Sequence, residues 1–424
     1  MKPGQRFLGK WFLFSTLLLG LPCHVWAEDL KLNRDIIQLD PLIQEALQNN
    51  PELVAVQAQV AAMRERIPQS NALDDPEFTI RLWNTPNSLN VTRSDRAIYG
   101  LAQQFPFPGT LSQQEHIAEK TFEQAKQRLA GKEREISAKV KVSYFELFYA
   151  HQAIDIHHEQ SSRLQQFFES ATAKFRVGKG TQVDVLKAQV ELSKWYQHLP
   201  ILEQQRETAQ AHLNMLLNRS TNTPLGVPSE PSWASKGLSL ATLQEQALQQ
   251  RPEIREAALV VEQYNSTIKL AELQTYPHLR VEVQRWQNYQ MDDGFGGIAS
   301  INLPFSFWTK SKYDAGVREA IAQREVAQFR KKTLENLTLF EIQDLLAQRN
   351  AKREILKLYK TTVLPQANLT LKAAMAGYRT NRTDFLDLLE ADRALLTYQL
   401  DYVRTLVDWE QLLAKLVRIV GAEL

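Results

Sequence analysis

Two short motifs in the sequence have residue types and spacing that could do chemistry. Gly178-Lys179-Gly180-Thr181 suggests a phosphate-binding loop, but it lacks the GxxxxGKS/T spacing and no strand is predicted before it. His157-His158-Glu159 begins like a zinc-binding HExxH helix, yet position 162 is serine. A glycine-bearing turn between two helices explains the first motif better. We therefore predict no enzyme activity, no cofactor and no metal site.

A third group is acidic. Asp384, Asp387 and Glu390 recur every third residue, so on a helix they share one face, and Tyr378 and Arg382 lie close by in the sequence. Three copies around an axis would form carboxylate rings that attract cations and gate an opening through ion pairs with Arg382. A solvated helix face without a gating role is the alternative, and the sequence leaves both open.

The elements that must position these residues occur twice. Residues 42–53 (LIQEALQNNPEL) and 243–254 (LQEQALQQRPEI) match at six of twelve positions. Later landmarks repeat at nearly the same offset, including Asp184 to Ala188 with Asp387 to Ala391. Each half therefore has one plan: a helix, two strands and a long helical hairpin. Residues 219–240, rich in Ser, Thr, Pro and Gly, are predicted to be the linker.

The predicted helices are unusually long. From Leu111 to Arg176 there is no proline, and such a stretch spans on the order of 100 Å as a helix. An apolar seam with three-to-four spacing predicts coiled-coil packing against neighbours of equal length. Its members are Ile136, Val140, Leu147, Ala150, Ile154, Leu164, Phe168, Ala171 and Phe175. Pro200 and Pro365 interrupt other helical stretches and predict kinks.

The predicted strands are short and alternate in polarity. Phe78, Ile80 and Leu82 point to one face, and the charged or polar residues between them point to the other. The second half repeats this alternation from His278 to Gln284. One apolar and one charged face is typical of a membrane β-barrel strand, although a half-buried strand of a soluble sheet has the same pattern. Four strands cannot close a barrel, so several chains must pool their strands. The joining loops, 84–95 and 287–296, are expected outside the cell.

The N-terminus predicts export. Residues 1–27 have a basic start, an apolar stretch and a cleavage site ending at Ala27, which is typical of a signal peptide; a retained membrane anchor is the alternative. The single cysteine, Cys23, lacks the residues expected before a lipid-modified cysteine. Removing three basic residues with this segment changes the formal charge from +2 to 47 − 48 = −1, which gives no reason to expect a nucleic-acid partner.

The duplicated plan is similar to the TolC-like outer-membrane efflux protein family. The matching motifs are ALQNNPEL and ALQQRPEI, FRVGKGTQVDVLKAQVEL (175–192), YRTNRTDFLDLLEADRAL (378–395), and the helix ends LNMLLN (213–218) and LVRIVG (416–421). The resemblance covers essentially the whole mature chain. The segments PFPGTLSQ (106–113) and LDDPEFTIRLWN (73–84) most resemble the branch that serves heavy-metal efflux.

The resemblance implies a mainly α-helical chain with membrane β-structure. It implies a homotrimer in the outer membrane of a Gram-negative bacterium, with a shared twelve-stranded β-barrel and a long periplasmic α-helical barrel. Residues 28–218 and 241–424 would be the two efflux-protein repeats, and the linker, with residues near 28–40, would form an equatorial collar. The chain would passively conduct solutes, heavy-metal cations among them, that an inner-membrane pump exports through a periplasmic adaptor.

The resemblance also implies where the adaptor meets the duct. Residues 177–184 and 380–387 would be turns at the periplasmic tip. The residues implied for adaptor contact are Val177, Gly178, Lys179, Gly180 and Asp184. Those implied for the aperture are Tyr378, Arg382, Asp384, Asp387 and Glu390. Asn381 stands where the family commonly has glycine, and asparagine tolerates the left-handed backbone better than most residues.

Two other protein classes compete with this interpretation. A periplasmic adaptor also carries a coiled-coil hairpin, but it would show one hairpin with β-rich flanking halves. A structural coiled-coil protein of the envelope would not need the alternating strands. An outer-membrane duct accounts for both features.

Overall fold

The computed structural model describes residues 36–85, 94–231, 237–289 and 292–422. The predicted signal peptide and Cys23 lie outside these residues. No helix in the described ranges is both long enough and apolar enough to cross a membrane.

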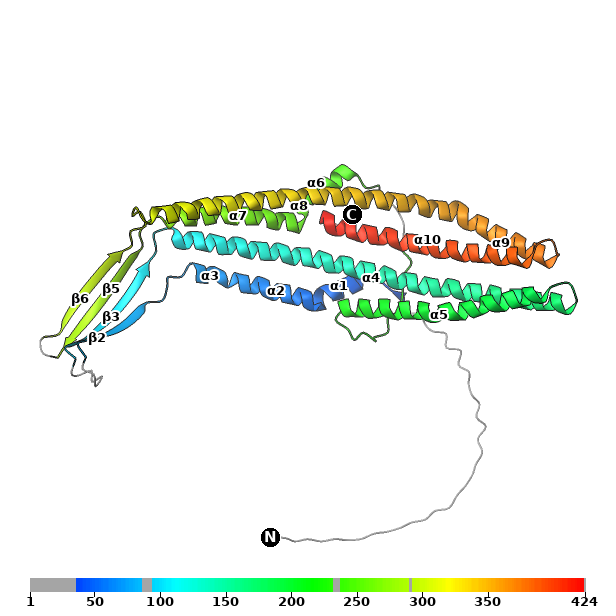
Figure 1. Cartoon of the computed structure of the whole chain (residues 1–424), viewed down its shortest axis with the longest axis horizontal. Coiled ribbons are helices and arrows are strands. Elements are labelled where there is room, and N and C mark those ends of the chain that lie inside the picture. The colour runs from blue at the N-terminus through cyan, green and yellow to red at the C-terminus, as the bar shows by residue number, and fades with distance from the viewer. Residues whose placement is uncertain (1–35, 86–93, 232–236, 290–291, 423–424) are drawn as a thin grey trace, which may run out of the picture. The chain divides into compact units, whose positions relative to one another are not determined.

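Both halves follow the predicted order of helix, two strands and long helical hairpin, although they divide their helices differently (Figure 1). The first half consists of α1 (Leu39–Asn49), α2 (Pro51–Arg64), α3 (Arg66–Ser70), β2 (Glu77–Trp83), β3 (Arg96–Phe105), α4 (Thr110–Arg176) and α5 (Gln182–Leu216). The second consists of α6 (Leu240–Gln250), α7 (Pro252–Leu273), β5 (Leu279–Asn288), β6 (Gly294–Ile301), α8 (Lys310–Leu358), η2 (Tyr359–Val363), α9 (Leu364–Arg379) and α10 (Phe385–Val420). The predicted unbroken helix is α4, with 67 residues.

The two prolines of the long arms are accommodated differently. Pro200 lies inside α5, which continues past it as one helix. Pro365 has no N–H to donate, and five residues of π-helix, η2, precede it, so that it falls in the first turn of α9. The second helical arm is therefore not one uniform α-helix: a π turn separates α8 from α9.

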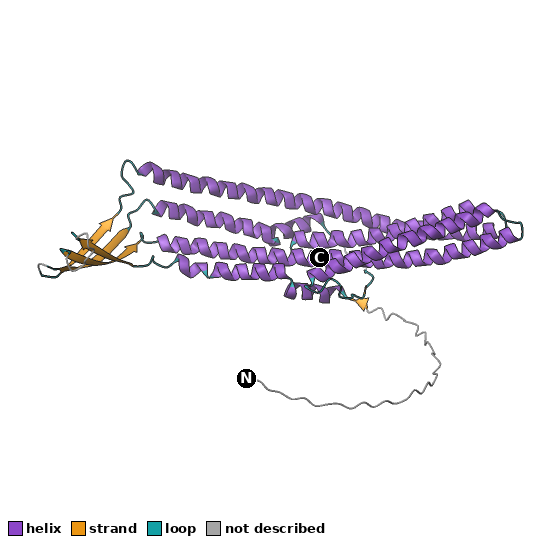
Figure 2. Ribbon diagram, turned by 60° about the horizontal axis from the view of Figure 1, so that its bottom comes forward, coloured by secondary structure: helices purple, strands orange, loops and turns teal. Residues whose placement is uncertain are grey.

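Four strands form one antiparallel sheet in the order β2-β3-β5-β6 (Figure 1), and this sheet lies at one end of the long helices (Figure 2). Each half contributes a hairpin, and the two hairpins join through β3 and β5. The pairing register places Phe78, Leu101 and Val283 side by side on one face, which confirms the predicted alternation. The second loop is shorter than expected, because β5 extends to Asn288 and β6 begins at Gly294.

The apolar seam of α4 is buried over most of its length. Ile136, Val140 and Leu147 lie in a core with α1, α5 and α10, and Leu164 and Ala171 lie in a second core with α9 and α10. The seam prediction is wrong at its end. Phe175 is 46% exposed, because it lies in the last turn of α4, and Phe167 is buried more deeply than Phe168.

The linker meets the N-terminal segment beside α4. β1 (Ile36–Ile37) pairs in parallel with β4 (Val227–Pro228). The buried hydroxyl of Tyr144 on α4 donates to the carbonyl oxygen of Ile37 at 2.9 Å and accepts from the Ser229 N–H at 2.8 Å. The two segments expected to share a collar are thus tied to each other and to the middle of α4.

Candidate functional site

The first hairpin turn, residues 177–181, depends on two glycines for different reasons. Gly178 has φ +69°, a left-handed conformation that side-chain-bearing residues adopt at a cost. A Cβ at Gly180 would lie 2.9 Å from the Cβ of Lys174 and 3.2 Å from the Phe175 nitrogen. Val177 and Lys179 are exposed. The turn is therefore a fixed, compact feature with two outward side chains.

Asp184 is engaged within its own helix. The Asp184 N–H donates to the Thr181 hydroxyl at 3.2 Å, and the Thr181 N–H donates to the Asp184 carboxylate at 3.3 Å. This reciprocal capping box satisfies two N–H groups that the start of α5 would otherwise leave unpaired. The helix therefore begins at Gln182, and the turn is shorter than the predicted 177–184.

The second hairpin turn, residues 380–384, uses asparagine where the first uses glycine. Asn381 has φ +59°, which confirms that it adopts the left-handed conformation. The Arg382 N–H donates to the Gly377 carbonyl at 2.8 Å, which closes the end of α9. The chain thus reverses in the same way at both turns.

The predicted aperture residues do not all share one helix face. Asp384 has an extended backbone (ψ 158°) and precedes α10, so only Asp387 and Glu390 lie on the helix. All three carboxylates are exposed, as is Arg382. Among the described residues no ion pair joins Arg382 to an acid. The predicted carboxylate rings and their pairing with Arg382 involve three copies around an axis, so they stay a prediction.

Tyr378 differs from the other predicted aperture residues because it is buried. Its ring packs against Phe385 with a centroid distance of 5.3 Å. Burial raises the pKa of the Tyr378 phenol to about 12, and the negative charge of Asp184 contributes to the same shift. The hydroxyl has no hydrogen-bond partner among the described residues. Tyr378 is therefore a neutral core residue at ordinary pH.

Lys174 joins the two hairpin turns, and sequence reasoning missed it. It lies in the last turn of α4, and its Nζ donates to the Tyr378 carbonyl and, at 2.5 Å, to the Asn381 Oδ1. The same Nζ lies 4.0 Å from the centroid of the Tyr378 ring. We call Lys174, Tyr378 and Asn381 the tip clasp. A cation here also offsets the partial negative charge at the end of α9.

A buried ion pair joins α4 to α10 at positions farther from the hairpin turns than the clasp. Asp392 is fully buried, and its carboxylate accepts from the Arg163 Nε at 2.7 Å and from the Gln160 Nε2 at 3.2 Å. Sequence reasoning missed this pair as well. The available signal was that Asp392 lies at helical spacing between the core residues Leu388 and Leu395, where an apolar residue is expected.

Comparisons with known proteins agree with this architecture. The sequence profile described as "Outer membrane efflux protein" matches residues 42–219 and 243–422. The chain belongs to the outer membrane efflux protein family. The family contains non-enzymatic transport proteins of the outer membrane with a periplasmic helical domain, so this efflux protein is an outer-membrane channel of an efflux system and not an enzyme.

Individual relatives resemble the efflux protein over nearly its full length. The cobalt-zinc-cadmium resistance protein CzcC of Cupriavidus metallidurans is 23% identical over 91% of this chain and 90% of its own. The solved structure of CusC has a TM-score of 0.79 at 18% identity, covering 91% of this chain and 92% of its own. The Vibrio cholerae outer membrane protein VceC has a TM-score of 0.75 at 18% identity, covering 91% and 96%.

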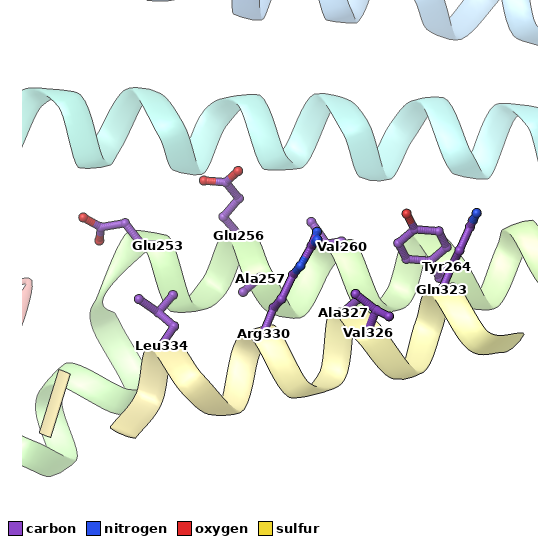
Figure 3. A pocket seen from close by; sticks show the side chains of 10 residues that line it. All are labelled: Glu253, Glu256, Ala257, Val260, Tyr264, Gln323, Val326, Ala327, Arg330 and Leu334. Atoms are coloured by element: carbon purple, nitrogen blue, oxygen red, sulfur yellow. The ribbon is translucent and has the colours of Figure 1, made fainter. Parts of the chain in front are cut away.

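The efflux protein has no feature of a conventional active site among its described residues. No group of three or more His, Cys, Asp or Glu residues there could hold a metal ion. A groove of about 490 Å³ lies between α7 and α8 (Figure 3). Of its carboxylates, Glu256 pairs with Arg128 of α4 at 2.6 Å and Glu253 pairs with Arg251 at 3.3 Å. The Glu256 pair thus joins α7 to α4, and the Glu253 pair lies at the start of α7 itself.

Proposed function

We propose that three copies of this efflux protein form one exit duct. Their strands would pool into a twelve-stranded outer-membrane barrel, and their helices would form a periplasmic tube. The sheet is the observation behind this proposal: among the described residues of one chain, β2 and β6 each have one unpaired edge. Unpaired backbone groups are costly in hydrocarbon, so an open four-stranded sheet requires further strands.

The exposed apolar side chains of the sheet support the same conclusion. Phe78 is 66% exposed and Phe295 is 78% exposed, and the register puts both on the apolar face. Contiguous apolar surface of this kind indicates contact with lipid or protein. The apolar face would lie against outer-membrane lipid, and the charged face would line the lumen.

The helices also present unpartnered apolar stripes that a second copy would cover. One stripe on α5 contains Val183, Leu186, Val190, Ile201 and Met215. The other, along α8 and α9, contains Val326, Phe329, Leu337, Phe340, Ile355, Leu358 and Leu369. Both stripes follow helical three-to-four spacing, which suits packing of α5 against α8 and α9 of the next copy. Such a head-to-tail contact closes into a ring.

The assembly is tested by the native mass of the protein extracted in mild detergent. We expect a trimer, because each chain supplies one third of the strands. A monomer or dimer that keeps its β-structure by circular dichroism would contradict the proposed duct. The same preparation should form channels in planar bilayers, which separates a folded duct from an aggregate.

We further propose that the two repeats, 28–218 and 241–424, have equivalent positions in the tube, with the 219–240 linker and the N-terminal strand in an equatorial collar. The hairpin turns would form the periplasmic tip, where Val177, Gly178, Lys179 and Gly180 contact an adaptor linked to an inner-membrane pump. The exposed aperture residues would control access to the lumen there. The resistance named for CzcC supports divalent heavy-metal cations as cargo.

The docking proposal predicts a specific loss of efflux. Gly178→Val should strain the turn, because φ +69° is costly for a β-branched residue, by roughly 1–2 kcal/mol. In a strain that supplies the adaptor and pump, this variant should lose most of the cobalt, zinc and cadmium resistance that the wild-type chain confers, while trimer yield stays normal. Gly316→Val, on α8 away from both turns, is a matched control.

Different results would contradict the docking site and the cargo. Full resistance with Gly178→Val would place adaptor docking elsewhere on the chain. No resistance from the wild-type chain, despite normal trimers, would remove metal cations as the cargo.

A further inference from the structure

The charged face of the sheet carries a connected network centred on one carboxylate. Glu77, Ala102 and Glu282 lie side by side in the register, and Arg81, Arg280 and Gln284 project from the same face. The Arg81 NH2 lies 3.5 Å from the Glu282 Oε1, and the Arg280 NH2 lies 3.9 Å from the Glu282 Oε2. Arg280 also pairs with Glu77 at 2.7 Å. Two arginines therefore share the carboxylate of Glu282.

The members of this network differ in exposure. The Glu282 side chain is 6% exposed, whereas that of Arg81 is 54% exposed and that of Arg280 is 36% exposed. Gln284 donates to the Glu282 Oε1 at 2.7 Å, which adds a neutral hydrogen bond to the buried acid. The Glu282 carboxylate is thus buried at the sheet surface, whereas the guanidinium groups of Arg81 and Arg280 are more exposed on the same face.

Gly100 makes room for this arrangement. A Cβ at position 100 would lie 2.7 Å from the Glu282 Oε1 and 2.6 Å from the Thr79 hydroxyl oxygen. The carboxylate therefore lies over the bare backbone of β3. Trp286, on the same strand as Glu282, packs in a similar way over the other neighbouring strand, where its ring covers Gly294 and Gly296 of β6. Because these glycines have no side chain, Glu282 and Trp286 can lie close to the backbone of the neighbouring strands.

We propose that Glu282 sets the ion selectivity of the channel lumen by neutralising Arg81 and Arg280. The inference rests on the proposed trimeric duct, in which the charged face lines the lumen. Two arginines and two glutamates (Glu77 and Glu282) give each copy a network charge of zero. Loss of Glu282 alone leaves one extra positive charge per copy and three around the lumen. Nearby charges of one sign raise the local concentration of their counter-ions.

The test is the reversal potential of single trimers in a KCl gradient. Glu282→Gln should shift the cation-to-anion permeability ratio toward anions by on the order of two- to fivefold at 0.1 M salt, and by less at 1 M, because the screening length falls from about 10 Å to about 3 Å. Arg81→Gln should shift the ratio in the opposite direction. The double variant should return close to the wild-type ratio, because it restores a network charge of zero.

Asp293→Asn is the matched control. Asp293 lies next to β6 and pairs at 3.4 Å with Arg285, which the register puts on the apolar face. This variant removes a carboxylate without changing the charged face, so the ratio should stay near the wild-type value. An unchanged ratio in Glu282→Gln, or equal shifts in Glu282→Gln and Asp293→Asn, would overturn the proposal. Failure of the wild-type chain to form trimers or channels would instead contradict the duct itself.

Discussion

Replacing Arg163 with methionine is expected to be among the most destabilising single changes in the helical region. The side chain of Asp392 is 1% exposed, and the Arg163 Nε, at 2.7 Å, is the one cation paired with it among the described residues. Methionine would leave the carboxylate with only the Gln160 amide at 3.2 Å. Removing one partner of a buried ion pair typically costs about 3–5 kcal/mol, because the remaining charge is uncompensated.

The measurement is the apparent unfolding temperature of the protein in detergent, which should fall by on the order of 5–10 °C. Arg163→Met combined with Asp392→Leu should recover much of this loss, because the double variant removes both charges from the core. Lys126→Met breaks an exposed pair with Glu123 at 3.0 Å and should change the temperature little. Equal, small effects of Arg163→Met and Lys126→Met would show that the Asp392 carboxylate is compensated in another way.

Asp392 illustrates why local pattern alone did not identify every important residue. Duplication, proline-free stretches and strand alternation are local properties, and they predicted the order and type of the elements in both halves. The partner of Asp392 lies 229 residues away, on α4, so this ion pair depends on tertiary packing that no local pattern encodes. The unexpected acid at a core position was visible in the sequence, but its partner was not.

Local pattern also predicted only part of the sheet. Alternation correctly separated the apolar face from the charged face, because side-chain direction in a strand has a period of two residues. It did not predict that the hairpins join through β3 and β5, nor that Gly100 leaves space for Glu282. The strand order and the Gly100–Glu282 contact depend on which strands are neighbours in the sheet. The spacing of residues within one strand does not determine its neighbours.

The predicted turns, 177–184 and 380–387, include the observed chain reversals, but both ranges run into the helices that follow, α5 and α10. Helical spacing, and then family resemblance, directed attention to the exposed acids and to Arg382. The structure instead joins the turns through Lys174, a residue that periodicity marks only as a polar position near a helix end. The side chain reaches a backbone carbonyl and Asn381, and carbonyl acceptors leave no trace in residue types. Lys174 is thus one of the residues that couple the two hairpins of one chain, together with the pairs Arg163–Asp392 and Arg393–Glu191.

Lys174→Met is expected to release the tip. The variant keeps an unbranched side chain one atom shorter, but it removes the charged group that donates to the Tyr378 carbonyl and the Asn381 amide oxygen. Hydrogen bonds from a charged donor contribute about 1.5–3 kcal/mol, and partial solvent exposure of the clasp favours the lower end of that range. A loss of about 1.4 kcal/mol changes an equilibrium tenfold. If the clasp holds the resting tip narrow, the fraction of time spent in a high-conductance state should therefore rise by up to about tenfold.

Single-channel recordings in planar bilayers test this expectation against the alternative that the acids act as the gate. Lys179→Met is the matched control, because Lys179 is exposed on the first turn and its side chain makes no hydrogen bond or ion pair among the described residues. Asp387→Ala combined with Glu390→Ala should abolish block by divalent cations if these carboxylates form rings around the lumen. Wild-type gating in Lys174→Met, with altered gating in the acidic double variant, would assign control of the tip to the carboxylates. The opposite result would assign it to the clasp, in which Lys174 links the two hairpin turns of each chain.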